Sequence, residues 1–135
     1  MSTDIRSELS KANPYWISKH RYYELKHFCM QYPEWRRALL AISEYKSGLS
    51  GKQGNQQADP TAAIASRRIE LSKRIDILEQ AAHQTDPVIG EYILKGVISG
   101  LSYDSMKARI EIPCCKDMYY HLYRRFFWLL DRMRD

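Results

Sequence analysis

Two residues that interrupt helices, Gly100 and Pro113, most constrain how the last third of this chain can fold. Glycine tolerates the left-handed backbone conformation common just past a helix terminus, and proline, which lacks an N–H group, suits the opening of a helix. Around Gly100, apolar residues recur at helical spacing: Ile89, Ile93, Leu94, Val97, Ile98 and Leu101. The sequence therefore predicts three helices separated by two turns.

The segment between the two breaks is expected to form a short helix over residues 103–109. It follows Ser102, whose hydroxyl can accept hydrogen bonds from the free N–H groups of a first helical turn. So short a helix is unstable by itself, and it therefore needs a neighbouring helix to pack against. Pro113 disfavours a helical Ile112, so the third helix is expected to open there. This order of elements is the outline of a helix-turn-helix.

The third helix is expected to be amphipathic, with an apolar stripe on one side and polar or basic groups on the other. The stripe comprises Met118, Leu122, Phe126, Leu129 and Met133, widened by Phe127, Trp128 and Leu130. The other side carries Lys116, Tyr120, His121, Arg124 and Arg125. A final helix that leads with basic groups suits insertion into a DNA major groove. Helical hairpins with a basic face also occur in proteins that do not bind DNA.

A resemblance supports the DNA-binding interpretation. The stretch I-S-G-L-S-Y-D-S-M-K-A-R-I-E-I-P resembles the promoter-reading helix-turn-helix of bacterial sigma factors and of phage late-gene activators of the RinA and ArpU kind. Residues 100–102 match that family's glycine-containing turn, 103–110 its short helix, and 112–113 its second turn. In that family, the fifth residue after the isoleucine of the second turn is usually an aliphatic core residue. In this chain that position is Asp117, and the nearest core candidate is Met118. The resemblance implies a phage-encoded regulator with a sigma-like C-terminal domain.

Six side chains are the candidate DNA contacts. Four in the third helix are expected to contact bases or phosphates, and two before it are expected near the DNA backbone: Lys116, Tyr120, His121 and Arg124, then Lys107 and Arg109. An arginine of this set can instead pair with Asp117 or Asp131 and serve only the fold. Double-stranded DNA is the expected partner, and host RNA polymerase is a further candidate partner.

The remainder of the chain is also expected to be helical, which makes the fold all-α. Residues 1–46 are predicted to form an N-terminal arm, a helical hairpin with helices over residues 15–30 and from Pro33 onward. Residues 47–60, rich in Gly, Ser, Asn and Gln, are predicted to be a flexible linker. Residues 61–135 would hold a long helix to about Gln84 and the helix-turn-helix. The long helix has an apolar seam of Ile64, Leu71, Ile75, Leu78 and Ala82, interrupted by Arg68.

Charge and composition fit a partner with negative charge. The formal net charge is +5, and the surplus lies at the two ends: residues 1–46 carry eight Lys/Arg against five Asp/Glu, and residues 104–135 carry seven against five. Ten tyrosines and three tryptophans favour a rival interpretation, since aromatic and arginine side chains dominate protein interfaces. In that alternative the chain is an interaction module that binds host RNA polymerase, a phage packaging component or a host defence nuclease.

Motifs for catalysis and for metal or cofactor binding are absent from the sequence. It contains no glycine-rich phosphate loop, G-x-S-x-G element or H-E-x-x-H pair, so we expect neither an enzyme nor a cofactor. The three cysteines, Cys29, Cys114 and Cys115, lack zinc-site spacing and suit a reducing, cytoplasmic setting, the host bacterial cytoplasm if a phage encodes the chain. No apolar run is long enough for a membrane span. A homodimer, in which the long helices of two copies pair, is a further alternative.

Overall fold

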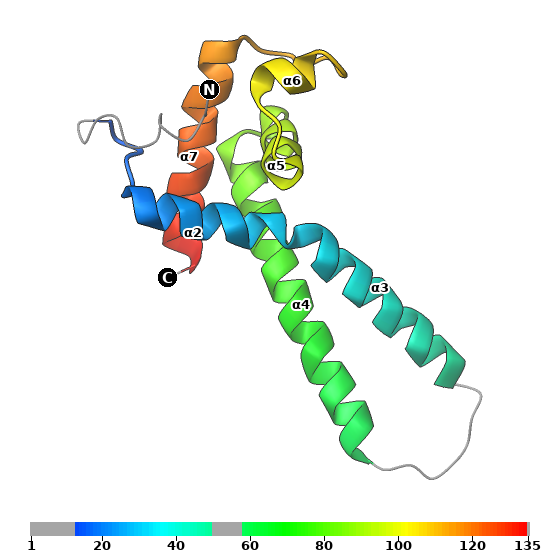
Figure 1. Ribbon diagram of the computed structural model, residues 1–135. Coiled ribbons are helices and arrows are strands. Elements are labelled where there is room, and N and C mark those ends of the chain that lie inside the picture. Colours follow the sequence, from blue (N-terminus) through cyan, green and yellow to red (C-terminus); the bar gives the residue numbers. More distant parts are fainter. Residues whose placement is uncertain (1–12, 50–57, 135) are drawn as a thin grey trace. The chain divides into compact units, whose positions relative to one another are not determined.

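The computed structural model describes residues 13–49 and 58–134, and in these ranges every regular element is a helix (Figure 1). The helices are α2 (Lys19–Met30), α3 (Tyr32–Leu49), α4 (Ala58–Thr85), α5 (Ile89–Ser99), α6 (Tyr103–Lys107) and α7 (Lys116–Arg134). The predicted all-α fold is confirmed. Helices α3 and α4 reach into both ends of the predicted linker, and residues 50–57 of that linker lie outside the described residues.

The chain divides into two compact units. One comprises the residues up to Gln31 together with those from Ile77 onward, and so holds α2, α5, α6, α7 and the end of α4. The other is Tyr32–Asp76, which holds α3 and the greater part of α4. Helix α2 thus belongs with the C-terminal helices despite its place in the sequence, because the chain returns to it through α4. The predicted boundaries at residues 47 and 60 stay a prediction.

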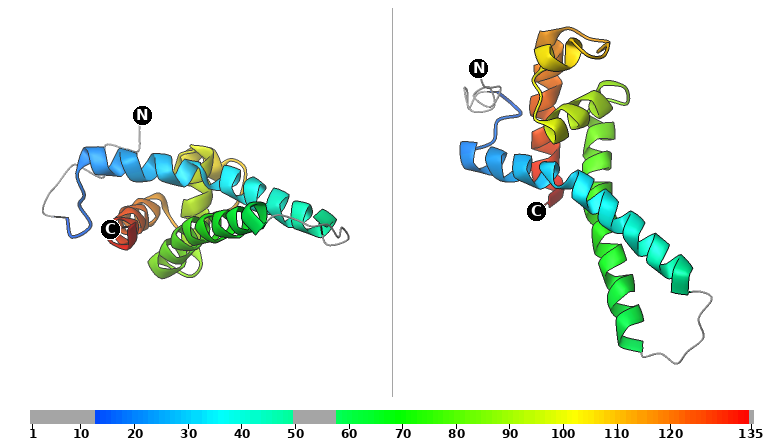
Figure 2. Two further views of the ribbon diagram at one scale, coloured as in Figure 1. Left: turned by 90° about the horizontal axis from the view of Figure 1, so that it is seen from below. Right: turned by 45° about the vertical axis from the view of Figure 1, so that its right-hand side comes forward.

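An aromatic core holds the first unit together. Helix α2 contacts both α5 and α7, and α5 also packs on α7 (Figure 2). The largest fully buried side chains of this unit include Tyr22, Leu25, Ile93, Tyr119, Phe126, Phe127 and Leu130. Two buried hydroxyls, those of Tyr22 and Tyr123, lie 2.8 Å apart and share a hydrogen bond. Burial without a partner would be costly for such groups, so this pair ties α2 to one face of α7.

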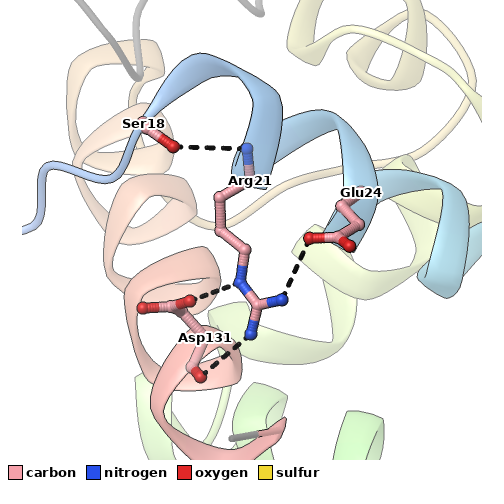
Figure 3. Close-up of polar contacts among 4 residues, drawn as sticks. All are labelled: Ser18, Arg21, Glu24 and Asp131. Carbon is pink, nitrogen blue, oxygen red and sulfur yellow. Dashed lines mark hydrogen bonds and ion pairs between the residues drawn. The ribbon is translucent and has the colours of Figure 1, made fainter.

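A second tie between α2 and α7 is an ion pair centred on Arg21. Its guanidinium donates from Nε to the carboxylate of Asp131 on α7 and from Nη1 to Glu24 at 3.0 Å (Figure 3). The hydroxyl of Ser18 accepts the backbone N–H of Arg21 at 3.3 Å and so caps α2. Helix α2 therefore begins at Lys19, and the predicted start at residue 15 is wrong. The preceding backbone instead turns at Asn13, whose side-chain oxygen accepts the N–H of Tyr15 at 2.8 Å.

The second unit is organised by Trp35 and by part of the predicted seam of α4. Trp35 is buried, and the guanidinium of Arg74 lies 5.8 Å from the centre of its ring. Arg74 also reaches Glu70 at 3.8 Å. Leu71 and Ile75 are buried as predicted, whereas Arg68, the charged member of the seam, is exposed. A charged head stays in water unless it is paired, which is why the seam is interrupted there.

Candidate nucleic-acid interface

The first turn of the predicted helix-turn-helix is present. Helix α5 ends at Gly100, whose φ of 71° and ψ of 25° are left-handed, and its N–H bonds back to the carbonyl of Val97 at 3.2 Å. The Ser102 hydroxyl then accepts the N–H of Ser105 at 3.2 Å and opens α6. Both predictions are confirmed. Helix α6 ends at Lys107, two residues before the predicted end at residue 109.

The second turn is tied to α6 by a side chain. Ile112 is buried, and the hydroxyl of Tyr103 donates to the carbonyl oxygen of Cys114 at 2.7 Å. The predicted break at Ile112 and Pro113 is confirmed, but α7 begins at Lys116 and not at Pro113. The residues after Pro113 form a further turn, in which Cys114 donates its N–H to the carbonyl of Ile112 at 2.8 Å. Helix α6 lies beside the N-terminal end of α7 as a result (Figure 1).

The buried face of α7 differs from the predicted stripe. It is made by Tyr119, Tyr123, Phe126, Phe127 and Leu130. Met118 is 47% exposed, so its assignment to the core is wrong. Leu122, Trp128, Leu129 and Met133, which are also members of the predicted stripe, are half-buried, and Phe126, Phe127 and Leu130 are buried as predicted.

The physical reason is that two tyrosines find polar partners inside the protein. The hydroxyl of Tyr119 points to the sulfur of Met106 at 3.8 Å, and that of Tyr123 bonds to Tyr22. Burial, together with the neighbouring Tyr123, raises the pKa of Tyr119. These rings can therefore take core positions that their hydroxyls would otherwise disfavour.

The six predicted DNA contacts are divided between exposed and half-buried positions. Lys107, Arg109, Lys116 and His121 are exposed, and the half-buried members are Tyr120 and Arg124. The ammonium of Lys116 pairs with the carboxylate of Asp104 on α6 at 3.0 Å. The hydroxyl oxygen of Tyr120 accepts the backbone N–H of Tyr103 at 2.9 Å, so it stabilises the start of α6. The four exposed side chains lie on α6, just after it, and on the first half of α7.

Opposite the buried face, α7 presents His121, Arg125, Trp128 and Arg132 at spacings of four, three and four residues. Tyr15, which precedes α2, packs on this face. Its ring centre lies 5.6 Å from that of His121 and 5.4 Å from that of Trp128. We call these five residues the outer strip. The helical spacing of the strip is visible in the sequence, but the apolar pattern places Trp128 in the core and gives Arg132 no role.

The two arginines of the outer strip are held by neutral groups. Arg125 donates from Nη1 to the hydroxyl of Tyr15 at 3.2 Å and from Nη2 to the backbone carbonyl of Gln84 at 3.3 Å. The guanidinium of Arg132 lies 4.6 Å from the ring centre of Trp128. Within residues 13–49 and 58–134, neither arginine forms an ion pair with a carboxylate. Their positive charges are therefore not cancelled locally, unlike that of Lys116.

The described part of the chain contains no cluster of three His, Cys, Asp or Glu side chains that could hold a metal ion. Cys29 is buried, and burial raises the pKa of its thiol. Burial, with Cys115 and Asp86 nearby, also raises the pKa of Cys114. A raised pKa disfavours the reactive thiolate. None of the described helices has the length and apolar character that crossing a membrane requires.

Comparison of the chain with protein-family models, with curated proteins and with solved structures found no match.

Proposed function

We propose that this protein binds double-stranded DNA through the helix-turn-helix formed by α5, α6 and α7. The observation that carries the proposal is the pair of turns at Gly100 and Pro113, which hold α6 beside the start of α7. A short helix followed by a longer one suits a recognition helix that enters the major groove while its neighbour approaches the DNA backbone.

The exposed basic side chains support the same proposal. Lys107 and Arg109 are exposed at the end of α6, and Lys116 and His121 are exposed on the first half of α7. Such groups contact phosphates or base edges and give DNA binding its dependence on salt. Tyr120 and Arg124 would contribute less, because the Tyr120 hydroxyl already accepts the backbone N–H of Tyr103 and the Nε atom of Arg124 is buried.

The biological role that we propose is transcription regulation in a phage. It follows from the resemblance of residues 98–113 to sigma-like helix-turn-helix domains, with the glycine turn at Gly100 and the short helix capped by Ser102. A regulator of this kind would have duplex DNA as its partner and would act beside host RNA polymerase in the bacterial cytoplasm.

The proposal is tested by fluorescence anisotropy with a labelled, mixed-sequence DNA duplex titrated at several salt concentrations. The double variant Lys107→Ala/Arg109→Ala should bind more weakly, and the slope of log affinity against log salt should be flatter by about 0.9 for each phosphate that the variant no longer neutralises. The matched control, Arg37→Ala/Arg67→Ala, removes the same charge at two exposed positions of the second unit. Absence of binding by the wild-type protein at low salt would refute the proposal.

A protein-interaction module is the second candidate, and exposed apolar side chains in the second unit favour it. Leu40 on α3 is 60% exposed, and Ile69 on α4 is 58% exposed. An exposed large apolar side chain gains free energy when a partner protein removes it from water. A pull-down from nuclease-treated host lysate separates the two candidates, because a direct protein partner survives the nuclease and a partner bridged by DNA does not. The double variant Leu40→Glu/Ile69→Glu should abolish capture of a direct protein partner and should not affect a partner bridged by DNA.

A further inference from the structure

We infer that the outer strip, Tyr15, His121, Arg125, Trp128 and Arg132, is a contact surface for the phosphate backbone of duplex DNA. This inference rests on the proposed function and extends it to residues behind the recognition end of α7. It also gives the segment before α2 a part in DNA binding, because Tyr15 belongs to the strip.

In the described part of the chain, positive charge on α7 is balanced by carboxylates near the start of the helix but not along the outer strip. Near the start of the helix, Lys116 is paired with Asp104 and is followed by Asp117, so positive charge there is largely cancelled. Along the outer strip, Arg125 and Arg132 have only neutral partners among the described residues. An uncancelled guanidinium attracts phosphate more strongly than one already paired with a carboxylate.

The second step is the way in which Arg125 is fixed. A guanidinium has five N–H donors in a rigid plane. Two nitrogens of Arg125 are directed at the Tyr15 hydroxyl and the Gln84 carbonyl, which leaves further donors in a fixed orientation. Side-chain entropy that is already restricted in the free protein is not restricted again on binding, so this arrangement favours capture of a phosphate. Arg132 is oriented similarly by the face of Trp128.

The arrangement of the aromatic rings in the strip favours duplex DNA over single-stranded DNA as the ligand. Single-strand binders use exposed rings as platforms on which bases stack. Here the ring of Tyr15 packs against both His121 and Trp128, and Trp128 also carries Arg132. These rings orient cations and are not open platforms. Arg125 and Arg132 are separated by seven residues of helix, a rise of about 10 Å, so the two guanidinium groups can contact different phosphates.

The test measures duplex binding by anisotropy as a function of salt for Arg125→Ala/Arg132→Ala. If this variant leaves two phosphates without a cation, the log–log salt slope should flatten by about 1.8 and the affinity should fall by more than about tenfold in 50 mM salt. The ratio of wild-type affinity to variant affinity should then fall about twelvefold as the salt concentration rises from 50 to 200 mM. Arg125→Lys/Arg132→Lys keeps the charges and should restore most of the slope, which a purely structural role would not predict.

Tyr15→Phe tests how Arg125 is held, because it removes the hydroxyl and keeps the ring. It should weaken duplex binding severalfold in the wild-type background and have no further effect once Arg125 is alanine. Circular dichroism checks that each variant is folded. Unchanged salt slopes in Arg125→Ala/Arg132→Ala, an equal reduction of affinity in the control Arg37→Ala/Arg67→Ala, or tighter binding of a single strand than of the duplex would overturn the inference. If either of the first two results accompanies duplex binding by the wild type that still depends on Lys107 and Arg109, the proposed function stands without the strip.

Discussion

Replacing Gly90 by alanine should destabilise the first unit, because the backbone of α4 at Ala82 lies directly against this glycine of α5. An added Cβ would collide with the backbone carbonyl oxygen of Ala82 and would lie 2.6 Å from its carbonyl carbon. Ordinary contacts begin near 3.4 Å. The obstacle is backbone and not a side-chain tip, so it cannot rotate away, and the two helices must separate by roughly 1 Å or more.

The expected magnitude is the balance of two effects. Alanine in place of glycine inside a helix normally adds about 0.5 to 1 kcal/mol of stability. Forcing extra volume into a packed core costs about 1 to 3 kcal/mol and sometimes more. The carbonyl that would be displaced also accepts the N–H of Asp86 at 3.3 Å, at the turn between the helices. We therefore expect a net decrease of about 2 kcal/mol in the free energy of unfolding.

Urea unfolding followed by far-UV circular dichroism measures this decrease, with Gly100→Ala as the control. Gly100 has a φ of 71° and no atom within 4 Å of an added Cβ, so alanine there meets backbone strain and no collision. That strain costs about 1 to 2 kcal/mol. A Gly90→Ala protein as stable as the wild type, or more stable, would refute the close approach of α4 and α5.

Two further predictions concern Asp86 and the cysteines. The carboxylate of Asp86 accepts the N–H groups of Val88 at 2.9 Å and Ile89 at 2.8 Å, and these bonds lower its pKa. The contribution of this carboxylate to the free energy of unfolding is therefore complete at neutral pH and is lost as pH falls below about 4. Asp86→Asn should remove this pH dependence, so the free energy of unfolding measured with urea should change less between neutral pH and about pH 4. An unchanged pH profile would contradict the prediction. In the native protein, a thiol reagent should modify exposed Cys115 and leave buried Cys29 unmodified until urea is added, as mass spectrometry of digested protein would show; early labelling of Cys29 would contradict its burial.

The site was partly predictable from sequence and partly not. Lys116 and His121 are exposed, as the amphipathic pattern of the final helix predicts, and Lys107 and Arg109 are exposed at the end of α6 and just after it. The way in which Arg125 is held was not predictable, because it depends on Tyr15, which lies 110 residues earlier in the chain. Similarly, nothing local distinguishes Lys116 from an unpaired lysine, since its partner Asp104 comes from α6.

The sequence by itself determined where the two turns of the C-terminal third lie, although not the exact end of α6 or the start of α7. The left-handed turn at Gly100, the Ser102 cap and the break before Pro113 depend on backbone conformations and N–H groups within a few residues, so local chemistry decides them. Only the tertiary structure decided which side of α7 is buried. Tyrosine can face water or the core, and the choice depends on whether distant groups form a hydrogen bond with its hydroxyl. Tyr22 forms such a bond with Tyr123, and Met106 accepts one from Tyr119, so the opposite side of α7 is turned outward.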